Sequence, residues 1–75
     1  MISKEDLINT IVKEIPSAQI VANDMTGGGD HWQLKIVAEE FRTCSLIEQH
    51  QLVYKALGSL MDKEIHALSL DTSAP

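Results

Sequence analysis

Residues 18–38, AQIVANDMTGGGDHWQLKIVA, decide the fold of this chain, because two extended segments flank three consecutive glycines. Residues 18–24 favour a strand centred on Ile20 and Val21. In residues 31–38, apolar and polar side chains alternate, which is typical of a strand with one buried and one wetter face. Glycine accepts positive φ without a steric penalty, so the stretch predicts an antiparallel hairpin with a glycine-rich turn.

The residues before this hairpin predict a helix. Ser3 can cap its N-terminus, and Asp6 favours the positive end of the helix dipole. Pro16 ends the helix, because a residue that precedes proline is pushed out of the α region. The apolar side chains in between recur at helical spacing and form one stripe: Leu7, Ile8, Ile11, Val12 and Ile15.

After the hairpin, residues 39–43 form a connection with one helical turn that buries Phe41. Ser45 and Glu48 have capping-box spacing and begin a second helix, which is expected to run to about Met61. Residues 65–70 predict a third strand, and residues 71–75 are expected to be a loose, flexible end.

The predicted order is therefore helix, strand, strand, helix, strand. The connection from the second strand to the third contains a helix, which favours a parallel pair with a right-handed crossover. We expect an α+β fold in which helices cover one face of a three-stranded mixed sheet, with residues 1–75 forming a single domain.

Size and charge narrow the possible functions. A chain of 75 residues has one thin core and little room for a closed, water-free active site, so we expect it not to be an enzyme. Its net charge of −5 repels nucleic-acid phosphates and anionic membranes. No segment predicts a membrane span or a signal peptide, and one cysteine agrees with a reducing compartment, so the expected location is the cytoplasm.

Two histidines are candidate metal ligands. His31 opens the second strand and His66 lies at the start of the third, and parallel neighbours begin at the same sheet edge about 4.8 Å apart. The alternation of side chains argues the other way. His31 is expected on the face opposite to the apolar Trp32, whereas His66 is expected on the same face as the apolar Leu68. The residues alone leave two alternatives open, a shared metal site or two unrelated surface histidines.

The remaining candidates are weaker. His50 lies in a polar helical stretch and is expected at the surface. Cys44 precedes a helix start, which can activate a thiol, but no histidine is obviously beside it to act as a base. The three glycines join two strands and do not open a helix, so they do not predict a phosphate site.

Several motifs occur together in an order that resembles the BolA family over nearly the whole chain. They are Asp24-Met25-Thr26-Gly27-Gly28-Gly29-Asp30-His31-Trp32, then Phe41, then Gln49-His50-Gln51-Leu52-Val53-Tyr54, and finally Ile65-His66-Ala67-Leu68. The resemblance implies a fold like the class II KH domain. It also implies a monothiol glutaredoxin as the partner in a heterodimer, in which a [2Fe–2S] cluster is shared with glutathione.

The same resemblance assigns the ligands. His66 matches the ligand histidine of the last strand, and His31 matches the histidine type of the loop ligand, since this chain has no cysteine there. We expect no cofactor in the free protein, and a monomer or weak dimer.

Two alternatives remain at this point: a DNA-binding regulator, opposed by only six dispersed Lys and Arg residues, and a thiol reductase using Cys44.

Overall fold

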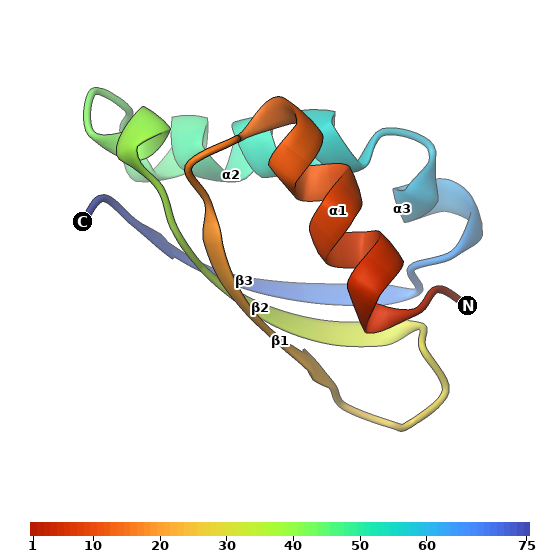
Figure 1. Cartoon of the computed structure of the whole chain (residues 1–75). Coiled ribbons are helices and arrows are strands. Elements are labelled where there is room, and N and C mark those ends of the chain that lie inside the picture. Colours follow the sequence, from red (N-terminus) through yellow and green to blue (C-terminus); the bar gives the residue numbers. More distant parts are fainter.

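A computed structural model describes all residues of the chain, 1–75. The elements follow in the order α1 (Lys4–Glu14), β1 (Gln19–Asp24), β2 (His31–Val37), the 3-10 turn η1 (Glu39–Phe41), α2 (Leu46–Leu57), α3 (Leu60–Lys63) and β3 (Ala67–Ser73). The helices form one layer over one face of the sheet (Figure 1). This is the α+β architecture that the sequence predicts. None of the helices is both long and apolar enough to span a lipid bilayer.

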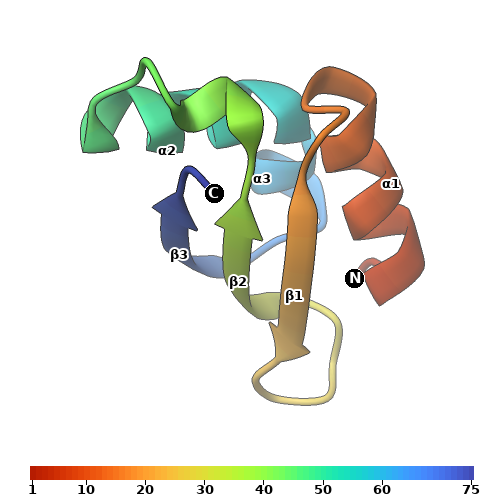
Figure 2. The same ribbon diagram turned by 60° about the vertical axis from the view of Figure 1, so that its left-hand side comes forward.

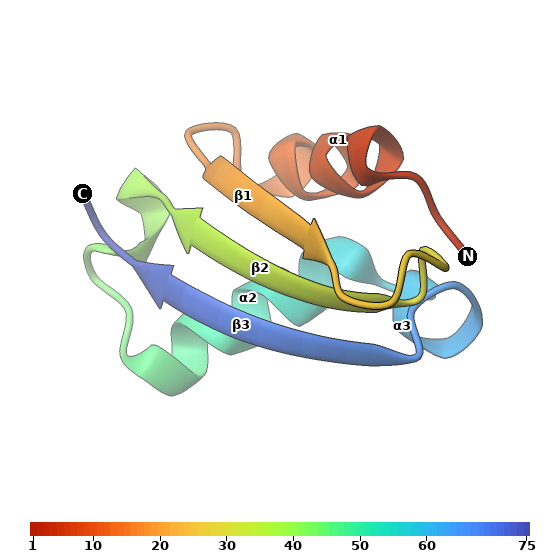
Figure 3. The ribbon, with the colours of Figure 1, turned by 90° about the horizontal axis from the view of Figure 1, so that it is seen from below.

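The sheet has three strands in the order β1-β2-β3, and the view from below shows its open face (Figure 3). β1 and β2 are antiparallel, from Gln19 opposite Val37 to Asp24 opposite Trp32. β2 and β3 are parallel, from His31 opposite Ala67 to Val37 opposite Ser73. The mixed sheet thus brings the glycine-rich turn and the start of β3 to the same end of the molecule.

Both long helices begin with side-chain caps. The Ser3 hydroxyl accepts a hydrogen bond from the Asp6 amide at 3.1 Å and begins α1. In α2, Ser45 and Glu48 form a reciprocal capping box, as the sequence predicts. α2 ends at Leu57, because Gly58 has a φ of +55° that is incompatible with a continuing helix.

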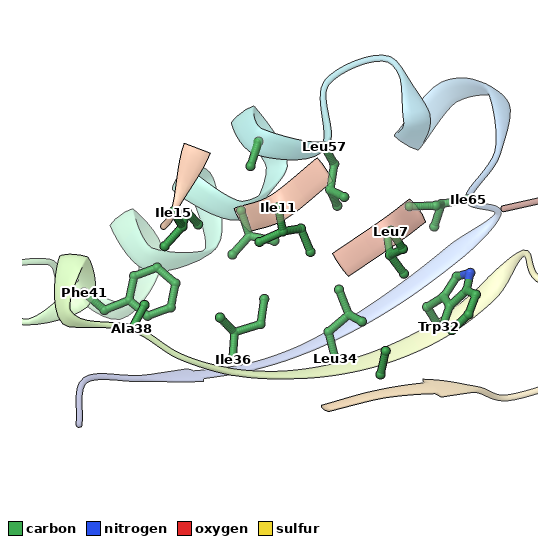
Figure 4. Close-up of a cluster of buried hydrophobic side chains, with 13 residues drawn as sticks. Leu7, Ile11, Ile15, Trp32, Leu34, Ile36, Ala38, Phe41, Leu57 and Ile65 are labelled. Carbon is green, nitrogen blue, oxygen red and sulfur yellow. The ribbon is translucent and has the colours of Figure 1, made fainter. Parts of the chain in front are cut away.

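The core lies between the helix layer and the inner face of the sheet (Figure 4). Leu7 and Ile11 of α1, and Ile15 at its C-cap, face the sheet from above. Trp32, Leu34 and Ile36 of β2 meet them from below. Phe41 closes the core at one end and is 1% exposed. Each such side chain contributes about 1.5–3 kcal/mol by leaving water. This packing fixes the side-chain alternation of β2, so His31 lies on the open face.

Three expected boundaries are wrong. α2 stops at Leu57 and a separate short helix, α3, follows, because Gly58 turns the chain. The third strand begins at Ala67, two residues later than expected, and runs to Ser73. The expected loose end at 71–75 is therefore largely strand, because β3 continues beside β2 as far as Ser73 (Figure 2). Thr72 is only 7% exposed.

Candidate metal-ligand site

The glycine-rich turn between β1 and β2 is held by its own polar groups. The Asp24 carboxylate accepts hydrogen bonds from the amides of Gly27 at 3.0 Å and Gly29 at 2.9 Å. Gly29 has a φ of +75°, and a Cβ added there would lie 2.9 Å from the Ile2 carbonyl oxygen. The Ile2 amide donates to the Gly29 carbonyl at 2.9 Å, so the turn packs against the start of the chain. These contacts position the residues that follow, Asp30 and His31.

A second set of hydrogen bonds joins this turn to the chain entering β3. The Asp30 carbonyl oxygen accepts from the amides of His66 at 2.6 Å and Ala67 at 3.1 Å. His66 itself lies in a bend just before β3 begins. The main chain therefore brings Asp30 into direct contact with residues 36 and 37 positions further along the sequence.

The imidazole rings of His31 and His66 lie side by side. Their centroids are 5.2 Å apart and their planes are inclined by 45°. The sequence alternation predicted opposite faces of the sheet for the two rings. That prediction does not hold, because His66 precedes the regular strand and the alternation of β3 does not apply to it. Both side chains reach solvent: the His31 side chain is 37% exposed and His66 is an exposed residue.

The side chain of Asp30, which the sequence did not indicate as part of the site, contacts the His31 ring. Oδ1 of Asp30 lies 2.9 Å from Nδ1 of His31, and the Thr26 hydroxyl donates to the same oxygen at 3.3 Å. The hydrogen bond with His31 holds the pKa of the Asp30 carboxyl below its usual value. The only sequence signal for this role is that Asp30 directly precedes His31, and adjacency alone does not predict a contact between two side chains.

The open face of the sheet beside His31 has a shallow hollow of about 250 Å³. Its lining includes the exposed Met25 and also Ala67, so it combines apolar surface with the His31 ring. Trp32, whose side chain is buried in the core, also lines this hollow, and its Nε1 is buried without a hydrogen-bond partner.

The other sequence candidates lie elsewhere. Cys44 lies between η1 and α2, which follow the Val37 end of β2, whereas the glycine-rich turn precedes the His31 end of that strand. Its thiol donates to the Glu40 carbonyl at 3.4 Å and is half-buried. His50 lies within α2, half-buried, with Nε2 unpartnered. The chain contains no group of three or more His, Cys, Asp and Glu side chains placed to hold a metal ion.

The sequence of this chain is similar to those of known proteins. The family model described as BolA-like protein matches residues 4–75. A protein of Rickettsia prowazekii, named only as uncharacterised, is 39% identical over 71 residues, covering 95% of this chain and 92% of that protein. Human BolA-like protein 3 is 38% identical over 71 residues, which are 91% of this chain and 65% of the human protein.

Solved structures share the fold. The structure of a BolA protein homologue from Coxiella burnetii superimposes with a TM-score of 0.82 and 33% sequence identity, and the match covers 100% of this chain and 94% of that one. The order of elements and the pairing of the strands described above are thus those of a known group of small proteins.

Proposed function

This chain belongs to the BolA family, and we propose that it is a non-enzymatic adaptor that pairs with a monothiol glutaredoxin and supplies His31 and His66 as ligands to a shared [2Fe–2S] cluster. The adaptor would act in the trafficking of iron–sulfur clusters or in iron regulation. The family and the fold suggest this role, and the pair of imidazole rings is the structural feature that supports it.

The spacing of the two rings is the observation that supports it best. Two imidazoles that bind one metal ion through bonds of about 2.1 Å at a near-tetrahedral angle have ring centres about 5.3 Å apart. The rings of His31 and His66 have centres 5.2 Å apart. This similarity in spacing supports the proposal that both rings bind one iron, and imidazole in place of thiolate raises the reduction potential of such a cluster.

The chemistry also requires a partner. A [2Fe–2S] cluster takes four protein-side ligands, and the two histidines supply half of them. The only thiol of the chain, Cys44, follows η1 beyond the far end of β2 from His31 and cannot join them. Thiolates from a glutaredoxin cysteine and from glutathione would complete the set. The exposure of His66 and of the adjacent hollow leaves this end of the molecule accessible to a second protein.

The proposal is tested by mixing the chain with a monothiol glutaredoxin, glutathione, iron and sulfide, and recording visible absorption and circular dichroism. We expect a spectrum that differs from that of the cluster-bridged glutaredoxin homodimer, because imidazole replaces thiolate. His31→Ala and His66→Ala should each destabilise the mixed complex. His50→Gln is the matched control, since it changes a histidine on α2, outside the site.

A spectrum identical to that of the glutaredoxin homodimer would show that this chain does not ligate the cluster. A mixed cluster with unchanged spectrum and lifetime in His66→Ala would overturn the ligand assignment while leaving the pairing of the two proteins intact.

A further inference from the structure

Asp30 directly precedes His31 in the sequence, and it contacts both histidines in space. Its carboxylate contacts the His31 ring, with 2.9 Å between Oδ1 and Nδ1. Its carbonyl oxygen accepts hydrogen bonds from the amides of His66 and Ala67, at 2.6 and 3.1 Å. One residue thus contacts the side chain of one candidate ligand and the main chain of the other.

We propose that Asp30 is the positioning residue of the site: its carboxylate holds the His31 imidazole with the proton on Nδ1, so that Nε2 keeps its lone pair for the metal, and its carbonyl fixes the main chain that carries His66. The inference rests on the proposed function, which identifies the group bound by the two histidines as a [2Fe–2S] cluster. It assigns a role to a residue other than the two proposed ligands.

The direction of the first hydrogen bond follows from the two groups. An ionised carboxylate only accepts hydrogen bonds, so Nδ1 of His31 is the donor and carries a proton. A neutral imidazole has one such proton, and its other nitrogen, Nε2, is then an acceptor with a free lone pair. A metal binds that lone pair, and a carboxylate behind the ring orients the ring and raises its basicity.

The carboxylate is itself held in place. The Thr26 hydroxyl donates to Oδ1 of Asp30 at 3.3 Å from within the same turn. The glycine-rich turn is held by Asp24, whose carboxylate accepts hydrogen bonds from two glycine amides. The His31 ring therefore faces a carboxylate that is held by the turn. The conformational entropy of the ring is lost when the chain folds, and not when the metal binds.

The carbonyl contact has a separate consequence. Two amides on one oxygen draw the chain entering β3 toward the start of β2, and this bend places His66 outside the regular strand. In a regular strand the side chains of consecutive residues leave by opposite faces. The bend therefore allows both rings to meet at 5.2 Å although the sequence alternation would separate them.

The test begins with the chain alone, labelled with ¹⁵N in its histidines, because the tautomer can be measured without a cluster or a partner. Long-range ¹H–¹⁵N spectra at a pH above the histidine titration should show His31 protonated on Nδ1. In Asp30→Ala, His31 should shift toward protonation on Nε2. Asp30→Asn keeps the shape of the side chain and should show an intermediate shift. Asp71→Asn is the matched control, because it removes a carboxylate from the exposed β3 surface away from the ring.

The same variants are then assembled with a monothiol glutaredoxin, glutathione, iron and sulfide, and the cluster is challenged with a chelator. Loss of an orienting partner of a ligand histidine typically costs 10–100-fold in affinity. We expect the mixed cluster to be lost at least about tenfold faster in Asp30→Ala, with an altered dichroism spectrum, and no change in Asp71→Asn.

Three results would decide against the inference or its premise. A wild-type His31 protonated on Nε2 would overturn the positioning role, and so would a cluster of unchanged lifetime in Asp30→Ala. A wild-type chain that forms no mixed cluster, with His31 protonated on Nδ1, would overturn the proposed function and leave the orientation of His31 by Asp30 established.

Discussion

The hydroxyl of Thr72 donates a hydrogen bond to the side-chain oxygen of Gln49, with 2.8 Å between Oγ1 and Oε1. This contact joins β3 to α2 through a residue that is 7% exposed. The side-chain nitrogen of Gln49 donates to the carbonyls of Cys44 at 3.3 Å and Phe41 at 3.5 Å. Gln49 therefore connects the last strand to the segment that leads into α2.

Removing this contact should lower stability. Thr72→Val keeps the shape of the side chain but leaves the Gln49 oxygen without its donor, so we expect a loss of about 1 kcal/mol in the free energy of unfolding. Urea unfolding of Thr72→Val, Gln49→Ala and the double variant gives the coupling energy. A coupling energy near zero would mean that the two side chains do not interact in solution.

Two glycines of the turn should differ in their tolerance of a side chain. Gly27 and Gly29 both have positive φ, +78° and +75°, which costs an L-residue about 1–2 kcal/mol. A Cβ on Gly27 meets nothing within 4 Å, whereas one on Gly29 lies 2.9 Å from the Ile2 carbonyl oxygen. We expect Gly29→Ala to cost more than Gly27→Ala, by about 1 kcal/mol or more, in thermal or urea unfolding. Equal losses would contradict the close packing of the turn against Ile2.

The capping box of α2 should make stability depend on pH. The Ser45 amide donates to Oε1 of Glu48 at 2.8 Å, and this bond holds the pKa of the Glu48 carboxyl below its ordinary value of 4.5. A carboxyl with a depressed pKa in the folded chain stabilises the fold above its unfolded pKa, and that contribution is lost as the pH falls through the folded pKa.

The comparison that isolates this effect is wild type against Glu48→Gln, because glutamine can still accept the capping hydrogen bond. We expect the wild type to be the more stable protein at neutral pH, and the difference to shrink as the pH drops below about 4.5 and to disappear below the folded pKa of Glu48. Melting temperatures of both proteins across this range test it. A difference that stays constant with pH would show that the Glu48 carboxyl titrates normally.

Trp32 should report cluster binding. It is the only tryptophan of the chain, and it adjoins His31 in β2. An iron–sulfur cluster absorbs across the emission range of indole, so a cluster bound to His31 should quench Trp32 fluorescence strongly. The measurement uses a glutaredoxin without tryptophan, and the same mixture without iron is the control. Emission that does not change when the cluster forms would place the cluster far from β2.

The order of the elements was predictable because local patterns specify it. Alternating apolar residues mark β2, the glycines mark the hairpin, and Ser3, Pro16 and the pair Ser45 and Glu48 mark helix ends. The exact end of α2 was not predicted, although Gly58 carries the signal. Apolar residues continue past it at helical spacing, and only the observed φ of +55° shows that the chain turns there.

The extent of β3 was not predictable from local pattern. Residues 71–73 are polar and resemble a loose end, yet they are ordered by pairing with Lys35, Ile36 and Val37. That pairing depends on the register of a parallel neighbour that lies more than thirty residues away in the chain. The contact of Thr72 with Gln49 depends on the same register.

The sequence by itself determined the α+β fold and the two histidines that are candidates for one site, because glycine conformations, helix caps and side-chain alternation act over a few neighbouring residues. Only the tertiary structure decided that the two rings meet, 5.2 Å apart. Alternation along separate strands predicted opposite faces for them. The hydrogen bonds from the His66 and Ala67 amides to the Asp30 carbonyl bend the chain ahead of β3, and such long-range main-chain bonds leave no pattern in the sequence.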